Sequence, residues 1–278
     1  MNSKKIGLGI ITCNRPEYLK NLVTSLVTCI DDIDELVVIN DGTSITNFNL
    51  FKGELLENET NLGVAKSKNK ALKYLLSKNC DYYFLIEDDM KIINPLVFQT
   101  YIDLCNISGI QHFNYGPGSP FNRKQSIQNF DLHNRHLLEE KTEPSPKLIV
   151  DYKSCKLALY EHVTGTFSFY TKKILDLVGV IDEQFFNAWD HVDHTYSIIK
   201  AGYHPPFWWF ADIHDSHKFI EPQQSAIKNS STSKNTESWL NNVRENAERY
   251  KQKNGHYPAE ARHVSQQDVV NFLKKLKK

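Results

Sequence analysis

The sequence lacks several features that would place it in a simple class of protein. It has no excess of either charge, since Lys plus Arg and Asp plus Glu each number 33. Nucleic-acid-binding surfaces usually appear as a basic excess, so we expect no nucleic-acid partner. The 5 cysteines are odd in number and contain no C-x-x-C pair, which favours reduced thiols over a disulfide framework or a zinc ribbon.

Long apolar runs are also absent. No stretch approaches the roughly 18 consecutive apolar residues of a membrane-spanning helix. The apolar stretch near the amino terminus is short and lacks a small-residue cleavage site. We therefore expect a cytoplasmic protein that is neither exported nor integral to a membrane. With 278 residues and 40% hydrophobic content, the chain can bury a full core.

What is present is an alternation of apolar and amphipathic segments. Strands are predicted at KIGLGIITC, ELVVIND and DYYFLIEDD. Helices are predicted at Leu19 to Leu26, at NLGVAKSKNKALKYLLSKN and at NPLVFQTYIDLCNISG, because their apolar residues recur at helical spacing. This order is typical of an α/β fold with a Rossmann-like, mostly parallel central sheet flanked by helices.

Polar residues stand where each predicted strand ends, and three acids stand together after the third. Glu87, Asp88 and Asp89 directly follow the apolar run YYFLI. In parallel sheets the ligand lies outside the carboxyl ends of the strands, so these acids should share one crevice with residues 12–15 and 40–42. Side chains alternate along an extended segment, which would point Glu87 and Asp89 to one side. Two carboxylates suit Mg²⁺ or Mn²⁺ carrying phosphate oxygens, although a solvated turn is the alternative.

Several motifs then match a known family. The segments ITCNRPEYLKNLVTSL, VINDGT, NLGVAKSKNKAL and LIEDDMKIINP occur in the order and approximate spacing found in family-2 nucleotide-sugar glycosyltransferases of the GT-A fold. The chain resembles that family over roughly residues 4 to 220, through GTFSFYTKKILDLVGVIDEQF and WDHVDHTYSIIKAGY. The resemblance implies a GT-A domain over 1–221, with a nucleotide-binding half (1–110) and an acceptor-binding half (111–221). Residues 222–278 would form a linker and a small C-terminal helical extension.

The resemblance also implies the residues of a nucleotide pocket. Asp41 matches the acid that recognises the base or the ribose. Lys68 stands where the family more often has Arg, which loses bidentate geometry but keeps the charge. The full expected set is Thr12, Asn14, Arg15, Asp41, Asn61, Gly63, Lys68 and Asp88.

The three acids stand at the D-x-D motif of the family, whose last acid contacts the metal. The resemblance therefore implies that Asp89 and Glu87 hold Mn²⁺ or Mg²⁺, with His217, or alternatively His214, completing the shell. H-x-x-H spacing is equally compatible with two surface histidines.

A glycine turn at Gly165 and Thr166, together with Trp189, would line the sugar and acceptor pocket. A plain strand start is the alternative for the turn.

An inverting transferase needs a base that takes the proton of the acceptor hydroxyl. The family places this acid at the start of a helix, where the present chain reads Asp190-His191-Val192-Asp193. Strict register puts His191 at the base position and Asp190 just before it. Because a carboxylate also stabilises an oxocarbenium-like sugar, we predict Asp190 as the base with His191 beside it. A purely structural helix cap is the alternative.

The resemblance thus implies a metal-dependent inverting glycosyltransferase. It would move a sugar from a nucleotide diphosphate donor, UDP-linked in our prediction, to a glycan or lipid-linked acceptor. The low glycine content and the many Lys, Asn and Ile residues are typical of an AT-rich bacterial gene, from which we predict a role in capsule or lipopolysaccharide synthesis at the bacterial surface. A sugar nucleotidyltransferase would need a glycine-rich loop after the first strand, and TCNRPEY contains no glycine. A non-catalytic nucleotide-sugar-binding module is the third interpretation, because the base motif is imperfect.

The end of the chain forms a predicted basic amphipathic helix. DVVNFLKKLKK places apolar residues among lysines, which is compatible with a peripheral contact at the inner face of the membrane. Packing on the domain, or self-association into a homo-oligomer, is the alternative.

Overall fold

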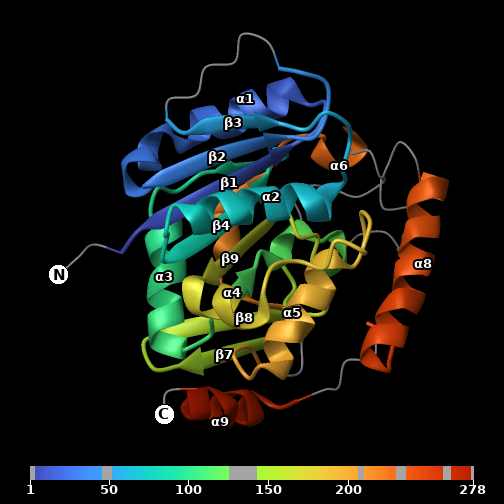
Figure 1. Ribbon diagram of the computed structural model, residues 1–278. Coiled ribbons are helices and arrows are strands. Elements are labelled where there is room, and N and C mark those ends of the chain that lie inside the picture. Colours follow the sequence, from blue (N-terminus) through green and yellow to red (C-terminus); the bar gives the residue numbers. More distant parts are fainter. Residues whose placement is uncertain are drawn as a thin grey trace.

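The structure is a computed structural model that describes residues 4–45, 52–124, 143–205, 210–229, 236–258 and 264–276. Within these ranges the centre is a six-stranded sheet of order β3-β2-β1-β4-β9-β6 (Figure 1). The first four strands pair in parallel, whereas β9 runs antiparallel to both neighbours. The predicted α/β fold with a mostly parallel central sheet is confirmed. The strands are β1 (Ile6–Thr12), β2 (Glu35–Asn40), β3 (Glu54–Glu57), β4 (Tyr82–Glu87), β6 (His112–Asn114) and β9 (Phe167–Thr171).

Helices cover both faces of this sheet, so its strands are buried on both sides. Alternate residues of β4 divide between the faces: Phe84 and Ile86 join the core beneath α1 and α3, while Tyr83 and Leu85 join the core beneath α2 and α4. The predicted strands and helices of the first half are all present. The helices are α1 (Pro16–Ser25), α2 (Val64–Ser77), α3 (Val97–Ser108) and α4 (Lys172–Val178).

Two glycines of β1 allow α2 to lie directly on the sheet. A Cβ added at Gly9 would lie 2.7 Å from Ala71 Cβ, and one added at Gly7 would lie 2.9 Å from Leu75 Cδ2. Larger side chains would push the helix away. The GLG sequence therefore fixes α2 close to β1.

Two smaller sheets complete the domain. β7 (Leu148–Tyr152), β8 (Cys155–Tyr160) and β10 (Phe210–Ile213) form an antiparallel sheet of order β10-β8-β7. β11 (Ile220–Pro222) pairs antiparallel with β5 (Met90–Ile92), which returns the chain to the end of β4. The predicted domain boundary after residue 221 thus falls inside β11. The remaining short elements are α5 (Asp190–Lys200), α6 (Ala226–Asn229) and the 3₁₀ turns η1 (Leu26–Asp32), η2 (Gly116–Gly118), η3 (Pro120–Asn122) and η5 (Ser216–Lys218).

The carboxyl-terminal region packs on this domain. The predicted linker contains α6, and its residues 230–235 lie outside the described ranges. α9 (Gln266–Leu276) lies against β7, where Val269 and Leu273 join the core (Figure 1). This use of the apolar side chains favours the packing alternative for α9, and membrane contact and self-association stay predictions. No helix within the described ranges has the length and apolar character to cross a bilayer.

A second helix, α8 (Thr236–Asn254), stands beside α5 (Figure 1). Its sequence is mostly polar and has no clear apolar stripe, so it carries no strong helix signal. It holds the segment that leads into α5: Trp189 donates its indole N–H to the carbonyl of Val243 at 2.8 Å. Asn246 donates to the carbonyls of Phe186 at 2.9 Å and Ala188 at 3.1 Å.

Lys253 completes the attachment of α8. Its ammonium lies 2.7 Å from Asp182 Oδ2 and 2.7 Å from Asp193 Oδ2, and Asn254 donates to the other oxygen of Asp193 at 3.1 Å. The Asp193 side chain is only 2% exposed. A buried carboxylate needs such partners, so α8 is bound to the first turn of α5.

We expect Lys253→Met to loosen this attachment by roughly 1–3 kcal/mol, because a buried carboxylate loses a charged partner. Amide hydrogen exchange should accelerate in α8 and in the first turn of α5, with β1 unchanged. Lys251→Met on the same helix is the control, since that side chain lies over the Tyr257 ring instead. Equal protection of α5 in both variants would contradict the role of Lys253.

Candidate active site

The carboxyl ends of β1, β2 and β4 meet at one edge of the central sheet. Thr12 donates its hydroxyl to Asp88 Oδ2 at 2.6 Å. The amide of Asp41 donates to the carbonyl of Thr12 at 2.8 Å, and the amide of Glu87 to that of Thr166 at 2.8 Å. Residues from four separate motifs therefore lie side by side.

The three consecutive acids have different partners. Glu87 Oε1 lies 2.9 Å from the ammonium of Lys68. Arg15 pairs with both Asp88 and Asp89, and its Nη1 lies 3.0 Å from Asp89 Oδ2. The side chains of Glu87 and Asp89 are 16% and 14% exposed, whereas that of Asp88 is fully buried. Burial raises the pKa of Asp88 to about 7, against the opposing effect of Arg15.

Lys68 is a buried cation at the centre of the site. Besides Glu87 it contacts the carbonyl of Gly165 at 2.8 Å and lies 3.9 Å from Asp190 Oδ2. Burial alone would lower the pKa of Lys68. The negative charges of Glu87 and Asp190 outweigh this effect, so the pKa of Lys68 is raised. Gly165 has a φ of +73°, and a Cβ there would lie 2.9 Å from the Lys68 ammonium and 2.9 Å from His191 Nδ1. Only glycine fits this turn.

Asp190 and His191 lie together at the start of α5. His191 Nδ1 is 3.3 Å from Asp190 Oδ1, and its Nε2 is 3.1 Å from the carbonyl of Val163. Both ring nitrogens thus face oxygen acceptors, and neither is placed to receive a proton from a substrate. Asp190 Oδ2, in contrast, is buried without a hydrogen-bond partner among the described residues.

The electrostatics of Asp190 keep this oxygen ionised. Burial alone would raise the pKa of Asp190, but the charge of Lys68 and the contact with His191 outweigh burial and hold it well below its usual range. A carboxylate oxygen that is ionised, buried and unpartnered can accept a proton from a hydroxyl that reaches it. This geometry favours Asp190 over His191 as the predicted base.

On the nucleotide side, Asp41 organises the start of α2. Its carboxylate accepts hydrogen bonds from the amides of Leu62 at 2.8 Å and Gly63 at 2.9 Å, and from Asn58 Nδ2 at 2.7 Å. Gly63 has a φ of +86° at the N-cap of α2. Three of the acceptor positions of Asp41 are therefore used within the protein.

Asn14 and Asn61 lie at the exposed rim of the site. Asn14 has a φ of +55°, and its Oδ1 accepts from the amide and the hydroxyl of Thr43 at 2.8 and 2.9 Å. Asn61 Nδ2 lies 3.3 Å from Cys13 Sγ. Both side chains stabilise the loops after β1 and β2.

The predicted acceptor-pocket residues are split between two roles. Thr166 is half-buried next to Glu87, and its hydroxyl lies 3.1 Å from that of Thr164. Trp189 has a φ of +67° and commits its indole N–H to α8. Trp189 is thus an anchor for α8, and its indole N–H is not free for a sugar.

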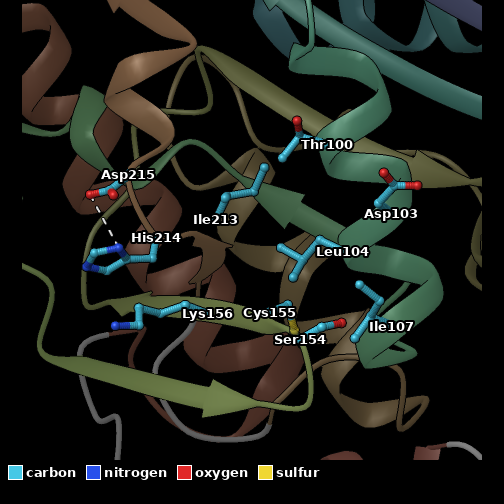
Figure 2. Close-up of a pocket in the computed structure, with 10 residues that line it drawn as sticks. All are labelled: Thr100, Asp103, Leu104, Ile107, Ser154, Cys155, Lys156, Ile213, His214 and Asp215. Atoms are coloured by element: carbon cyan, nitrogen blue, oxygen red, sulfur yellow. Dashed lines mark ion pairs between the residues drawn. The ribbon is translucent and has the colours of Figure 1, made fainter.

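The predicted metal shell is not assembled. Among the described residues, no three His, Cys, Asp or Glu side chains converge where they could hold a metal ion. His214 instead faces Asp215 at 3.3 Å in a pocket between α3 and the β7–β8 hairpin (Figure 2). His217 lies in η5, ahead of β11.

Strand direction explains why the two histidines lie away from the acids. β11 pairs Pro222 with Met90 and Ile220 with Ile92, so the chain before β11 extends away from Asp89. After β11 the chain reaches the acids at Gln223. Its backbone N–H donates to the carbonyl of Asp89 at 2.7 Å, and its side-chain amide donates to the carbonyl of Asp88 at 2.7 Å. Sequence reasoning missed Gln223, since a lone glutamine after a proline carries no signal.

We expect Lys68→Met to destabilise the protein by roughly 3–5 kcal/mol, because it leaves two buried carboxylates without their cation. Burial already raises the pKa of Glu87, and removing Lys68 would raise it further, so the folded state would bind protons more tightly than the unfolded state. The loss of unfolding free energy should therefore be larger at about pH 8 than at about pH 5. Denaturant unfolding at the two pH values measures it. Lys66→Met, on the exposed side of the same helix, should show neither effect.

Known proteins resemble this chain in sequence and in fold. No protein-family model matches the chain. It is similar to the curated protein "Uncharacterized glycosyltransferase R363" of Acanthamoeba polyphaga mimivirus, with 23% identity over 240 residues, covering 82% of this chain and 84% of that protein.

Among solved structures, the chain is similar to S. aureus TarS, with a TM-score of 0.50 and 15% identity. The match covers 87% of this chain and 45% of that TarS chain, so the chain spans less than half of it. The structure of TarS 1–349 in complex with UDP-GlcNAc matches with a TM-score of 0.50 and 14% identity over 98% of this chain and 71% of that chain. At this identity the likeness shows the fold. The chain is thus similar in sequence to a glycosyltransferase and in fold to TarS, and the resemblance to glycosyltransferases predicted from its motifs is confirmed.

Proposed function

We propose that the protein is an inverting glycosyltransferase that takes a sugar from a nucleotide diphosphate donor. One observation carries the proposal: beside the strand-end acids, Asp190 Oδ2 is buried, lies 3.9 Å from the Lys68 ammonium and has no hydrogen-bond partner among the described residues. This is the group that an inverting transfer requires next to its donor site.

Charge in the site supports a divalent cation. Among the described residues, two permanent cations, Arg15 and Lys68, pair with the four acids Glu87, Asp88, Asp89 and Asp190, so the fully ionised acids exceed these cations by two negative charges. A diphosphate would be repelled there unless a dication came with it. Asp89 Oδ1 is buried without a partner among the described residues and could serve as a direct ligand. Mn²⁺ or Mg²⁺ held by Asp89 would supply charge neutralisation for the leaving diphosphate.

The nucleotide would occupy the edge formed by Thr12, Asn14, Asp41 and Asn61. This edge lies at the carboxyl ends of β1 and β2, where ligands of open α/β sheets bind. The TarS complex with UDP-GlcNAc has the same fold, which supports a UDP-linked donor.

In the transfer, the acceptor hydroxyl oxygen forms a bond to the anomeric carbon while the bond from that carbon to the diphosphate oxygen breaks. The hydroxyl proton passes to Asp190 Oδ2, and the diphosphate leaves with the bonding electron pair. Lys68 keeps Asp190 ionised before the acceptor binds. A glycan or lipid-linked sugar is the proposed acceptor class; the curated relative is viral, so a role in bacterial surface polysaccharide synthesis rests on composition.

We expect Asp190→Asn to keep donor affinity and to lower turnover by about two to four orders of magnitude, the range for a positioned base. Release of UDP from a UDP-sugar, with and without sugar acceptors, measures turnover, and calorimetry measures affinity. Asp176→Asn, at an exposed aspartate paired with Lys172, is the control.

A larger loss in His191→Ala would move the base to His191. Donor binding without turnover in the unchanged protein would instead support a non-catalytic binding module.

We expect Asp89→Ala to reduce UDP affinity in Mn²⁺ to the level that the unchanged protein shows in chelator, since the proposed direct ligand is gone. Calorimetric titration checks this. Asp103→Ala is the control, because Asp103 lies in the separate pocket of Figure 2. Equal affinity of both variants in Mn²⁺ would show that Asp89 does not hold the metal.

A further inference from the structure

Arg15 occupies the position between the last two acids. Its guanidinium pairs with Asp88 Oδ1 through Nη2 and with Asp89 Oδ2 through Nη1 at 3.0 Å. The side chain is only 19% exposed. Arg15 is also the N-cap residue of α1, and the preceding Asn14 is held by Thr43. The fold therefore presents this guanidinium to the acids.

This pairing leaves little room for a metal ion. Both oxygens of Asp88 are engaged, one by Thr12 and one by Arg15. Glu87 Oε1 is engaged by Lys68, and Asp89 Oδ1 is buried without a hydrogen-bond partner among the described residues. Mg²⁺ and Mn²⁺ prefer about six oxygen ligands, so acids that already share their oxygens with Arg15, Lys68 and Thr12 make a weak site for a metal ion alone. The positive charge of Arg15 adds repulsion to any dication at the same place.

We propose that Arg15 is an internal counter-ion that keeps the metal site closed until a diphosphate is present. The inference deepens the proposed function and rests on it. A diphosphate supplies both the missing oxygen ligands for the metal and a new anionic partner for the guanidinium. Metal and donor then bind together, and the metal alone binds poorly.

The test is a titration of Mn²⁺ into the protein without nucleotide. The electron paramagnetic resonance signal of free Mn²⁺ measures how much of the metal has bound. An adjacent guanidinium changes the proton affinity of a carboxylate by about one to three pKa units, so Arg15→Gln should bind Mn²⁺ about ten-fold or more tightly than the unchanged protein. Lys20→Gln, an exposed position on α1, is the control and should not change affinity. If Arg15→Gln binds Mn²⁺ no better than the unchanged protein, Arg15 does not close the site.

Arg15→Lys provides a second variant that keeps the charge. A lysine cannot pair with two carboxylates at once as the guanidinium does. The Mn²⁺ affinity of Arg15→Lys should therefore lie between that of the unchanged protein and that of Arg15→Gln. An affinity equal to that of the unchanged protein would show that charge alone, and not the two-acid pairing, is responsible.

A second experiment, the binding of UDP with Mn²⁺ or with chelator, separates this inference from the proposed function. We expect UDP to bind the unchanged protein in Mn²⁺ and to lose most of its affinity in chelator. Equal affinity in both, lost in Arg15→Gln, would mean that Arg15 replaces the metal, which overturns the inference. Absence of UDP binding under every condition would defeat the proposed function, while the Mn²⁺ arm would still report on Arg15.

Discussion

The buried ammonium of Lys68 is the contact on which the site depends. It joins Glu87 at the end of β4, the carbonyl of Gly165 before β9 and the region of Asp190 at the start of α5. A single side chain therefore connects α2 to three other parts of the fold. Its position follows from the core, because Gly7 and Gly9 of β1 let α2 lie directly on the sheet. Without this cation two carboxylates would share a buried space, which is strongly unfavourable.

Local pattern was sufficient to predict the first half of the fold and the position of the acids. A short apolar run rich in aromatic residues, such as YYFLI, favours a buried strand over a helix, and acids directly after such a strand lie at its end. The same reasoning located Thr12 and Asp41, since the ends of parallel strands meet at one edge. The exposure of Glu87, Asp88 and Asp89 alternates as predicted, but β4 ends at Glu87, and Asp88 and Asp89 lie in a turn where both pair with Arg15.

Features that depend on long-range topology could not be predicted in this way. The spacing of His214 and His217 does not encode the direction of β11, which carries them away from Asp89 and brings Gln223 there instead. α8 is recognised only by what it contacts, because its sequence is polar almost throughout. The pairing of Arg15 with two acids is invisible in sequence, since it requires the loop after β1 to meet the end of β4.

The central claim is that the acids at the end of β4 and the two cations beside them form a site for a nucleotide diphosphate with its metal. The most direct measurement is calorimetric titration of UDP, GDP, CDP and dTDP into the protein, each with Mn²⁺ and with chelator. The account predicts that one nucleotide, with UDP as the expected one, binds in Mn²⁺ and much more weakly in chelator. Failure of all four to bind under either condition would contradict it, and the acids would then be a charged but unused edge of the sheet.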